Sequence, residues 1–193
     1  MGSGVILGLV GGLFCLLVVA VIGWALAAYN RLVRQRNQVQ ASWAQIDVQL
    51  KRRYDLIPNL VETVKGYAAH ERGTLESVVS ARTGAIQAAG APGVADRAAA
   101  ENVLTQALGR LFALAEAYPD LKANQNFAAL QGELAHTEDK IAYARQFYNS
   151  AVQTFNTTVQ SIPTNIIAGV GGFRAMDFFE TSDGERVPVQ VRF

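Results

Sequence analysis

Apolar residues follow two different patterns along the 193-residue chain. The first stretch, Gly4–Ala28, is apolar and carries no charged side chain. From Leu32 onward, apolar positions instead recur in alternating steps of four and three, which is the spacing of a helix packed along one stripe. The first pattern predicts a membrane-spanning helix, and the second predicts an all-α domain of packed helices.

The Gly4–Ala28 stretch fits a retained transmembrane helix better than a cleavable signal peptide. About 25 helical residues span about 37 Å, which exceeds the hydrocarbon core of a bilayer at about 30 Å. A signal peptide would begin with basic residues and carry an apolar core of about 7–15 residues. Residues 1–3 contain no basic side chain. We therefore expect residues 1–3 to form a short extracytoplasmic N-terminus and residues 4–28 to cross the membrane once.

The residues that flank this helix predict its orientation. Arg31, Arg34 and Arg36 follow the apolar stretch, and no Lys or Arg precedes it. Under the positive-inside rule, the following domain lies in the cytoplasm and the N-terminus lies outside. Trp24 and Tyr29 stand near the inner boundary, where aromatic side chains commonly anchor a helix.

Glycines in the apolar stretch suggest a helix–helix contact. Gly4, Gly8 and Gly12 are spaced four apart, so they share one face in the manner of a GxxxG motif. This face predicts self-association of the chain in the membrane. The alternative is that glycine is simply frequent in membrane helices.

The first helix of the predicted domain carries two rows of positions at seven-residue spacing. It continues in register across Pro58, so we expect a kink near Tyr54–Asp55 rather than a reversal of the chain. We expect this helix to end near His70, before Gly73. The two rows are Leu32, Val39, Ile46, Arg53, Leu60 and Tyr67, and Arg36, Trp43, Leu50, Ile57 and Val64.

Three further helices are predicted. The second carries its stripe on Leu75, Val78, Val79, Arg82 and Ile86. The third ends at Pro119, and the fourth covers about residues 124–161. Because the connections are short, neighbouring helices should be antiparallel. Residues 29–161 are therefore predicted to form an up-and-down four-helix bundle with two long and two short helices.

Residues 162–193 form a C-terminal tail that starts at the membrane end of the predicted bundle. The tail opens with an apolar, glycine-rich piece and closes with the alternating run Val187–Phe193, after the turn signal Ser182–Glu185. This pattern predicts a small β-hairpin. Pro188 would confine the hairpin to an edge.

The first bundle helix also carries an unusual number of charges. Asp47, Lys51 and Asp55 are spaced four apart, which predicts a ladder of ion pairs on one helix face. Arg53 differs because it occupies a position in the apolar stripe, where a charge needs a partner. In an antiparallel bundle Arg53 lies level with about residue 141, so we expect it to pair with Glu138 or Asp139 and to fix the register of the two long helices.

The composition points away from several kinds of function. The chain has 17 Lys and Arg against 16 Asp and Glu, whereas nucleic-acid binding usually needs a basic excess. Its one cysteine, Cys15, lies in the apolar stretch. His70 and His136 have no second ligand at metal-binding spacing. We therefore expect no enzyme activity, no cofactor, no metal and no nucleic-acid partner.

Several motifs resemble the bacterial LemA family. They are Tyr29–Val33, Arg36–Val39, Trp43–Arg53, Asp55–Val61, Tyr118–Asn124, the pairs Thr137-Glu138, Tyr148-Asn149, Phe155-Asn156 and Gly172-Phe173, and Phe178–Glu180. The resemblance covers nearly the whole chain. It implies a single-pass protein of the bacterial inner membrane with a helical-bundle domain, in a family that includes a relative associated with magnetosome membranes. Members are often encoded near membrane metalloproteases, and the family supplies no catalytic residues to carry over.

These observations favour a non-enzymatic, membrane-anchored scaffold or adaptor that self-assembles. The alternative is a regulator of a membrane protease or a component of envelope-stress signalling. The expected partners are the lipid bilayer, other copies of the chain, and a membrane metalloprotease or other membrane protein. The candidate structural and interaction residues are Gly4, Gly8, Gly12, Trp43, Asp47, Arg53, Asp55, Pro58, Asn59, Glu62, Glu138, Asp139, Tyr148 and Asn149.

Overall fold

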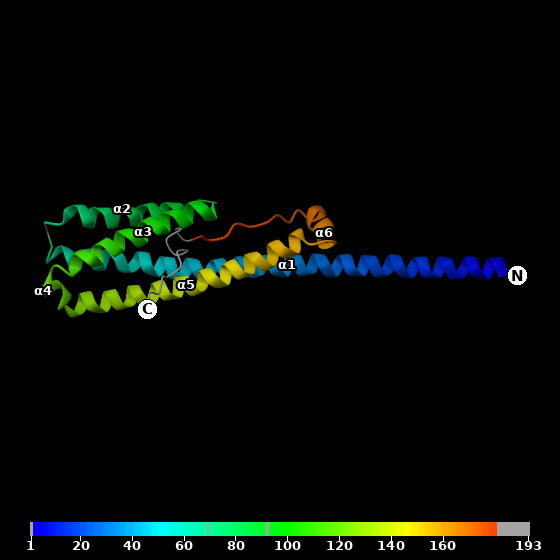
Figure 1. Cartoon of the computed structure of the whole chain (residues 1–193), viewed down its shortest axis with the longest axis horizontal. Helices are drawn as coiled ribbons and strands as arrows, with labels where there is room; N and C mark the ends of the chain where they lie inside the picture. Colours follow the sequence, from blue (N-terminus) through cyan, green and yellow to red (C-terminus); the bar gives the residue numbers. More distant parts are fainter. Residues whose placement is uncertain (1, 69, 92, 181–193) are drawn as a thin grey trace, which may run out of the picture. The chain divides into compact units, whose positions relative to one another are not determined.

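The computed structural model describes residues 2–68, 70–91 and 93–180, with side chains from residue 8 onward (Figure 1). Within this part of the chain every regular element is a helix, so the all-α prediction is confirmed. The hairpin predicted over Val187–Phe193 lies outside the described residues. The helices are α1 (Gly2–Lys65), α2 (Arg72–Ala89), α3 (Val94–Ala115), α4 (Pro119–Lys122), α5 (Gln125–Gln160) and α6 (Thr164–Val170).

Helix α1 joins the apolar stretch to the amphipathic one without a break. It continues through Pro58, so the prediction that the chain does not reverse there is confirmed. The helix ends at Lys65 rather than near His70, because the amides of Tyr67 and Ala68 both turn back to the carbonyl of Val64. Tyr67, the last member of the predicted row, is exposed because it follows the end of the helix.

Among the described residues, α1 is the one helix that is long and apolar enough to cross a membrane. Its large apolar side chains from Leu9 to Leu26 are exposed. This exposure suits a lipid environment, because contiguous apolar surface is unfavourable in water.

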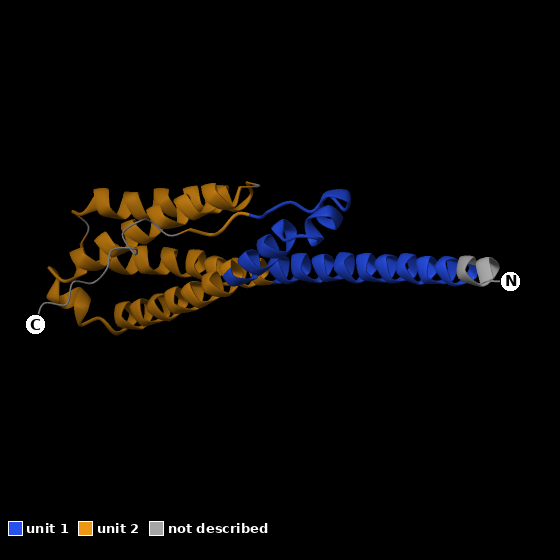
Figure 2. Cartoon of the chain, turned by 45° about the vertical axis from the view of Figure 1, so that its right-hand side comes forward, with its two compact units in different colours: residues 1–41, 150–176 blue, residues 42–149, 177–193 orange. Residues whose placement is uncertain are grey.

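The chain divides into two compact units, and both α1 and α5 contribute to each of them (Figure 2). Unit 1 combines residues 1–41 with 150–176, and unit 2 combines residues 42–149 with 177–193.

Unit 1 is centred on Phe173, which follows α6. Its ring contacts Tyr29 at 5.5 Å and Phe155 at 6.4 Å between centroids, and the guanidinium of Arg36 lies 5.2 Å from its centroid. A β-carbon at Gly171 would lie 2.7 Å from this ring, so glycine is needed for the close approach. The buried side chains of this unit include Leu32, Val39, Val152, Phe155, Ala168 and Phe173.

In unit 2, α1 and α5 run in opposite directions. Asn124 donates a hydrogen bond to the Tyr67 hydroxyl at 2.9 Å, and the Trp43 and Tyr148 rings lie 5.2 Å apart. The residue numbers thus rise along α1 as they fall along the facing side of α5, which is the antiparallel arrangement. The core of this unit draws on α1, α2, α3 and α5, and includes Ile46, Leu50, Ile57, Leu60, Leu75, Val78, Leu104, Leu111, Leu134 and Ile141.

The buried face of helix α2 shares Leu75 and Val78 with the predicted stripe but is shifted toward two alanines. It buries Leu75, Val78, Ala81 and Ala85. Val79 and Ile86, which the predicted stripe included, are exposed. The small alanines allow a close helix contact, and a pattern search that counts large apolar residues undervalues them. The short helices α4 and α6 were not predicted either.

Candidate functional site

The main cluster of charge in unit 2 surrounds Arg53, whose side chain is almost fully buried at 1% exposure. The guanidinium donates to Glu138 on α5 and to Glu101 on α3, and to the Thr105 hydroxyl at 3.1 Å. The structure therefore pairs Arg53 with one of the two carboxylates expected from the register, while Asp139 is exposed. Three helices meet at this one side chain.

Glu101 is the part of the cluster that the sequence analysis missed. Its carboxylate is buried, and its two oxygens accept hydrogen bonds from Arg53 and from the hydroxyl of Tyr54. Arg97, Glu101 and Thr105 are spaced four apart on α3, so they share one helix face. Three polar residues at this spacing, on a helix otherwise rich in alanine and leucine, are the sequence signal for this face.

The pKa values of Arg53 and Tyr54 are both raised in this cluster. Burial alone lowers the pKa of Arg53, but the charges and hydrogen bonds of Glu138 and Glu101 outweigh burial, so its pKa is raised above the ordinary value. Burial, with the hydrogen bond to Glu101 as the next cause, raises the pKa of Tyr54. Arg53 is therefore a permanent cation and Tyr54 a neutral donor throughout the physiological range.

A second ion pair corrects the predicted ladder on α1. Asp47 contacts the buried Arg97 of α3 at 2.5 Å, and the described ion pairs include none of Lys51. The physical reason is that a buried guanidinium needs a carboxylate, whereas an exposed lysine gains little from one. Arg97 also lies 5.0 Å from the centroid of the Trp43 ring, in a cation–π contact.

Trp43 connects this ion pair to an aromatic group. Its ring lies 5.2 Å from Tyr148 on α5 and 5.6 Å from Phe179 in the C-terminal segment. The guanidinium of Arg145 lies 5.2 Å from the Phe179 centroid. Burial, with a smaller contribution from Asp177, raises the pKa of Tyr148 to about 12. The Tyr148 hydroxyl donates to the backbone carbonyl of Asp177 at 2.9 Å.

Asn149 holds the C-terminal segment through the backbone. Its amide nitrogen donates to the Phe179 carbonyl at 3.1 Å, and its oxygen accepts from the Phe179 amide at 2.9 Å. Asn156, seven residues later on α5, makes the same pair of bonds to Met176 in unit 1. The repeat of an aromatic residue followed by Asn, in Tyr148-Asn149 and Phe155-Asn156, is the sequence signal for this arrangement.

Replacing Asn149 by alanine is expected to release the segment around Phe179. The substitution leaves the backbone amide and carbonyl of Phe179 unpaired, at about 1–3 kcal/mol for each such group. Hydrogen exchange at the Phe179 amide, which loses its acceptor, should become faster. Asn126→Ala, at an exposed position on the same helix, is the matched control. Equal exchange rates in the two variants would show that the amide does not hold the segment.

The remaining sequence candidates lie on surfaces. Asp55, Pro58, Asn59 and Glu62 are exposed on α1, and Glu62 contacts Lys65 at 3.7 Å. A β-carbon added at Gly8 or Gly12 would have open space around it, and Gly4 lies in the first turns of α1. These residues do not meet the Arg53 cluster among the described contacts.

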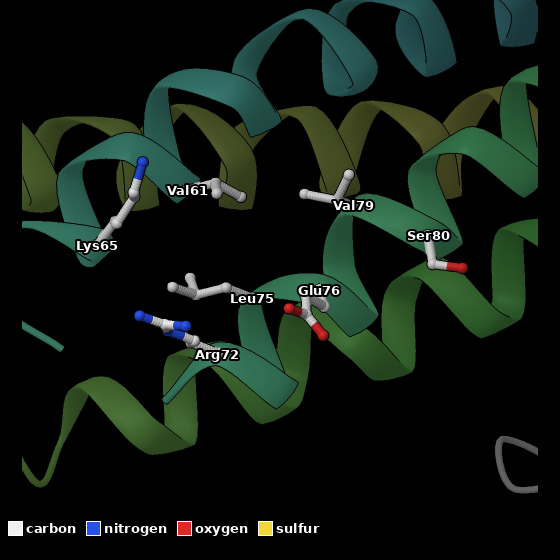
Figure 3. Close-up of a pocket in the computed structure, with 7 residues that line it drawn as sticks. All are labelled: Val61, Lys65, Arg72, Leu75, Glu76, Val79 and Ser80. Carbon is white, nitrogen blue, oxygen red and sulfur yellow. The ribbon is translucent and has the colours of Figure 1, made fainter. Parts of the chain in front are cut away.

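A groove in unit 2 lies where α1 and α2 meet. It has a volume of about 520 Å³. Figure 3 shows Val61, Leu75 and Val79 around the opening, with Lys65 and Arg72 at one end. Val79 is exposed because it lines this groove, which explains its departure from the predicted stripe.

The described residues contain no group of three or more His, Cys, Asp or Glu side chains that could hold a metal ion. In the Arg53 cluster each carboxylate is engaged by a cation or a hydroxyl. This arrangement joins helices and has the features of a structural network.

Comparisons with known proteins agree with the resemblance. Residues 42–193 match the LemA family. The chain is 28% identical to magnetosome protein MamQ 2 of Paramagnetospirillum magneticum, over 89% of this chain and 72% of that protein. It is 26% identical to magnetosome protein MamQ of Magnetospirillum gryphiswaldense over the same shares. It is also 26% identical to protein LemA of Metamycoplasma hominis, over 84% of this chain and 73% of that protein.

Proposed function

The chain belongs to the LemA family, and we propose that it is a non-enzymatic, membrane-anchored helical scaffold that self-assembles at a bacterial inner membrane. In this proposal α1 crosses the bilayer once, with the N-terminus outside and the helical domain in the cytoplasm. The arginines that follow the apolar stretch support this orientation. The MamQ homologues support membrane association.

The observation that carries the proposal is the continuity of α1. One helix supplies both the exposed apolar stretch and the buried stripe of unit 2. No loop separates the two, so the anchor continues directly into the first helix of the domain. Such a helix suits a protein that holds a domain near a membrane. We infer that the domain is an up-and-down bundle, in which the Arg53 cluster sets the register of its helices.

The glycine face is the surface proposed for self-assembly. A β-carbon at Gly8 or Gly12 would meet no described atom of the chain, so this face is open to a second copy. Close approach of backbones along small residues is a common way for membrane helices to associate.

Purified full-length protein in mild detergent should therefore run as a homo-oligomer of high mass. Gly8→Leu/Gly12→Leu is expected to lower the mass, because the leucines keep the backbones apart. Gly23→Leu, at another open glycine of α1, is the matched control. Size-exclusion chromatography with multi-angle light scattering, at micromolar concentration, would measure all three. A wild-type chain that is strictly monomeric at micromolar concentration would contradict the proposal.

The groove between α1 and α2 favours a second candidate, an adaptor that regulates a membrane metalloprotease. Its lining combines apolar side chains with Lys65 and Arg72 at one end and Glu76 away from that end, which suits a segment of another protein. A monomeric chain that binds a purified membrane metalloprotease stoichiometrically would favour this function over the scaffold.

A further inference from the structure

Helix α6 carries large apolar side chains that the described chain leaves uncovered. Ile166 is 64% exposed and Val170 is 88% exposed, and Ile162 just before the helix is 84% exposed. Ile166 and Val170 are four apart and share one face of the helix. Residues 161–173 contain no charged residue. An uncharged segment with this much exposed aliphatic surface is typical of a contact site.

Unit 1 places α6 next to the end of the apolar stretch. Phe173, three residues after α6, donates its amide to the carbonyl of Ala168 in α6 at 2.9 Å. The Phe173 ring then contacts Tyr29, which directly follows the stretch expected to cross the membrane. Both are in unit 1, which Figure 2 draws in blue. The exposed side chains of α6 are thus held near the point where α1 would leave the bilayer.

The charge of unit 1 has one sign. Residues 1–41 and 150–176 contain no Asp or Glu, and their charged residues are Arg31, Arg34, Arg36 and Arg174. The 16 acidic residues of the chain all lie in unit 2. Four arginines around an apolar segment complement the anionic headgroups of a cytoplasmic leaflet.

We propose that α6 is a second membrane contact, which lies in the interfacial layer of the bilayer that α1 crosses and inserts Ile166 and Val170 among the lipids. An interfacial helix of this kind buries its apolar face about 5–10 Å into the headgroup and acyl boundary. The inference rests on the proposed membrane anchoring by α1. It gives unit 1 a second contact with the bilayer that α1 crosses.

The test uses a polarity-sensitive fluorophore on a cysteine in the full chain, with Cys15→Ala removing the native thiol. Val170→Cys reports on α6, and Val103→Cys, at an exposed position on α3, is the matched control. Leu17→Cys reports on the anchor. The proteins are reconstituted in liposomes that contain an anionic phospholipid. Some liposomes also contain a lipid with a nitroxide quencher near the headgroup end of its acyl chain, and others contain a lipid with the nitroxide near the end of the chain, which is the quencher for Leu17→Cys.

The label at Val170→Cys should emit at a shorter wavelength than the label at Val103→Cys, and the nitroxide lipid near the headgroup should quench it. Emission and quenching equal to those of Val103→Cys, with Leu17→Cys still quenched, would overturn the inference and leave the anchor intact. A blue-shifted label that the nitroxide lipid does not quench would mean that a protein surface covers α6, which also overturns it. If Leu17→Cys is not quenched, the anchor fails and the inference fails with it.

Discussion

Replacing Arg53 by methionine is expected to destabilise unit 2 by about 3–5 kcal/mol, because it breaks a buried ion pair by removing one partner. Glu101 would remain buried, with one oxygen bound only by the Tyr54 hydroxyl and the other without its cation. Methionine keeps the apolar stem of the arginine, so little packing is lost. Urea unfolding of the full chain in detergent, followed by circular dichroism, would measure the loss.

The neighbouring arginine offers the matched control. Arg52 pairs with Glu133 at 2.6 Å, but both side chains are about half exposed. Arg52→Met should therefore cost only about 0–1 kcal/mol. Combining Arg53→Met with Glu101→Leu should recover much of the stability, because no buried charge is then left alone. Equal losses for Arg53→Met and Arg52→Met would contradict the role assigned to the cluster.

The cluster also shows why a simple charge swap is a poor test of the register. Exchanging the charges of Arg53 and Glu138 restores their attraction, but it places the new carboxylate at position 53 against Glu101. Glu138 has a side chain that is 39% exposed, whereas the side chain of Glu101 is 5% exposed. Because attraction between charges is stronger where water is excluded, Glu101 is the partner that matters more for stability.

The sequence supplied the partner on α5 but not the one on α3, and the difference has a physical cause. A seven-residue repeat on two long helices shows which faces of the helices meet. Once the helices are taken as antiparallel, it also shows which residue of one helix lies opposite a given residue of the other. The level expected for Arg53 was about residue 141, within one helical turn of Glu138. Helix α3 is short and joined by loops, so periodicity cannot say at which level it meets α1.

The sequence analysis missed the position of the C-terminal segment for another reason. Asn149 and Asn156 bind the backbone of Phe179 and Met176, and backbone groups are the same in every residue. The tail sequence therefore carries no sign of where it is held. Helix α6 also escaped prediction, because its stretch is too short to show a period and contains glycine.

Replacing Trp43 by alanine is expected to cost about 3 kcal/mol, near the lower end of the range for large aromatic residues because the ring is only partly buried. The ring joins three elements, through Arg97 on α3, Tyr148 on α5 and Phe179 in the C-terminal segment. Its loss should weaken all three contacts together, so the amide of Phe179 should exchange hydrogen faster as well.

The conservative variant Trp43→Phe should keep most of this stability, since it retains a ring against Tyr148 and Phe179 while reducing the cation–π contact with Arg97. Tyr143→Ala, at an aromatic residue of α5 that is 74% exposed, is the control for loss of a surface ring. Unfolding in urea and exchange at Phe179 should rank the variants in one order, with Trp43→Ala most affected. If Trp43→Ala behaved like Tyr143→Ala in both measurements, the contacts of Trp43 would not hold α3, α5 and the C-terminal segment together.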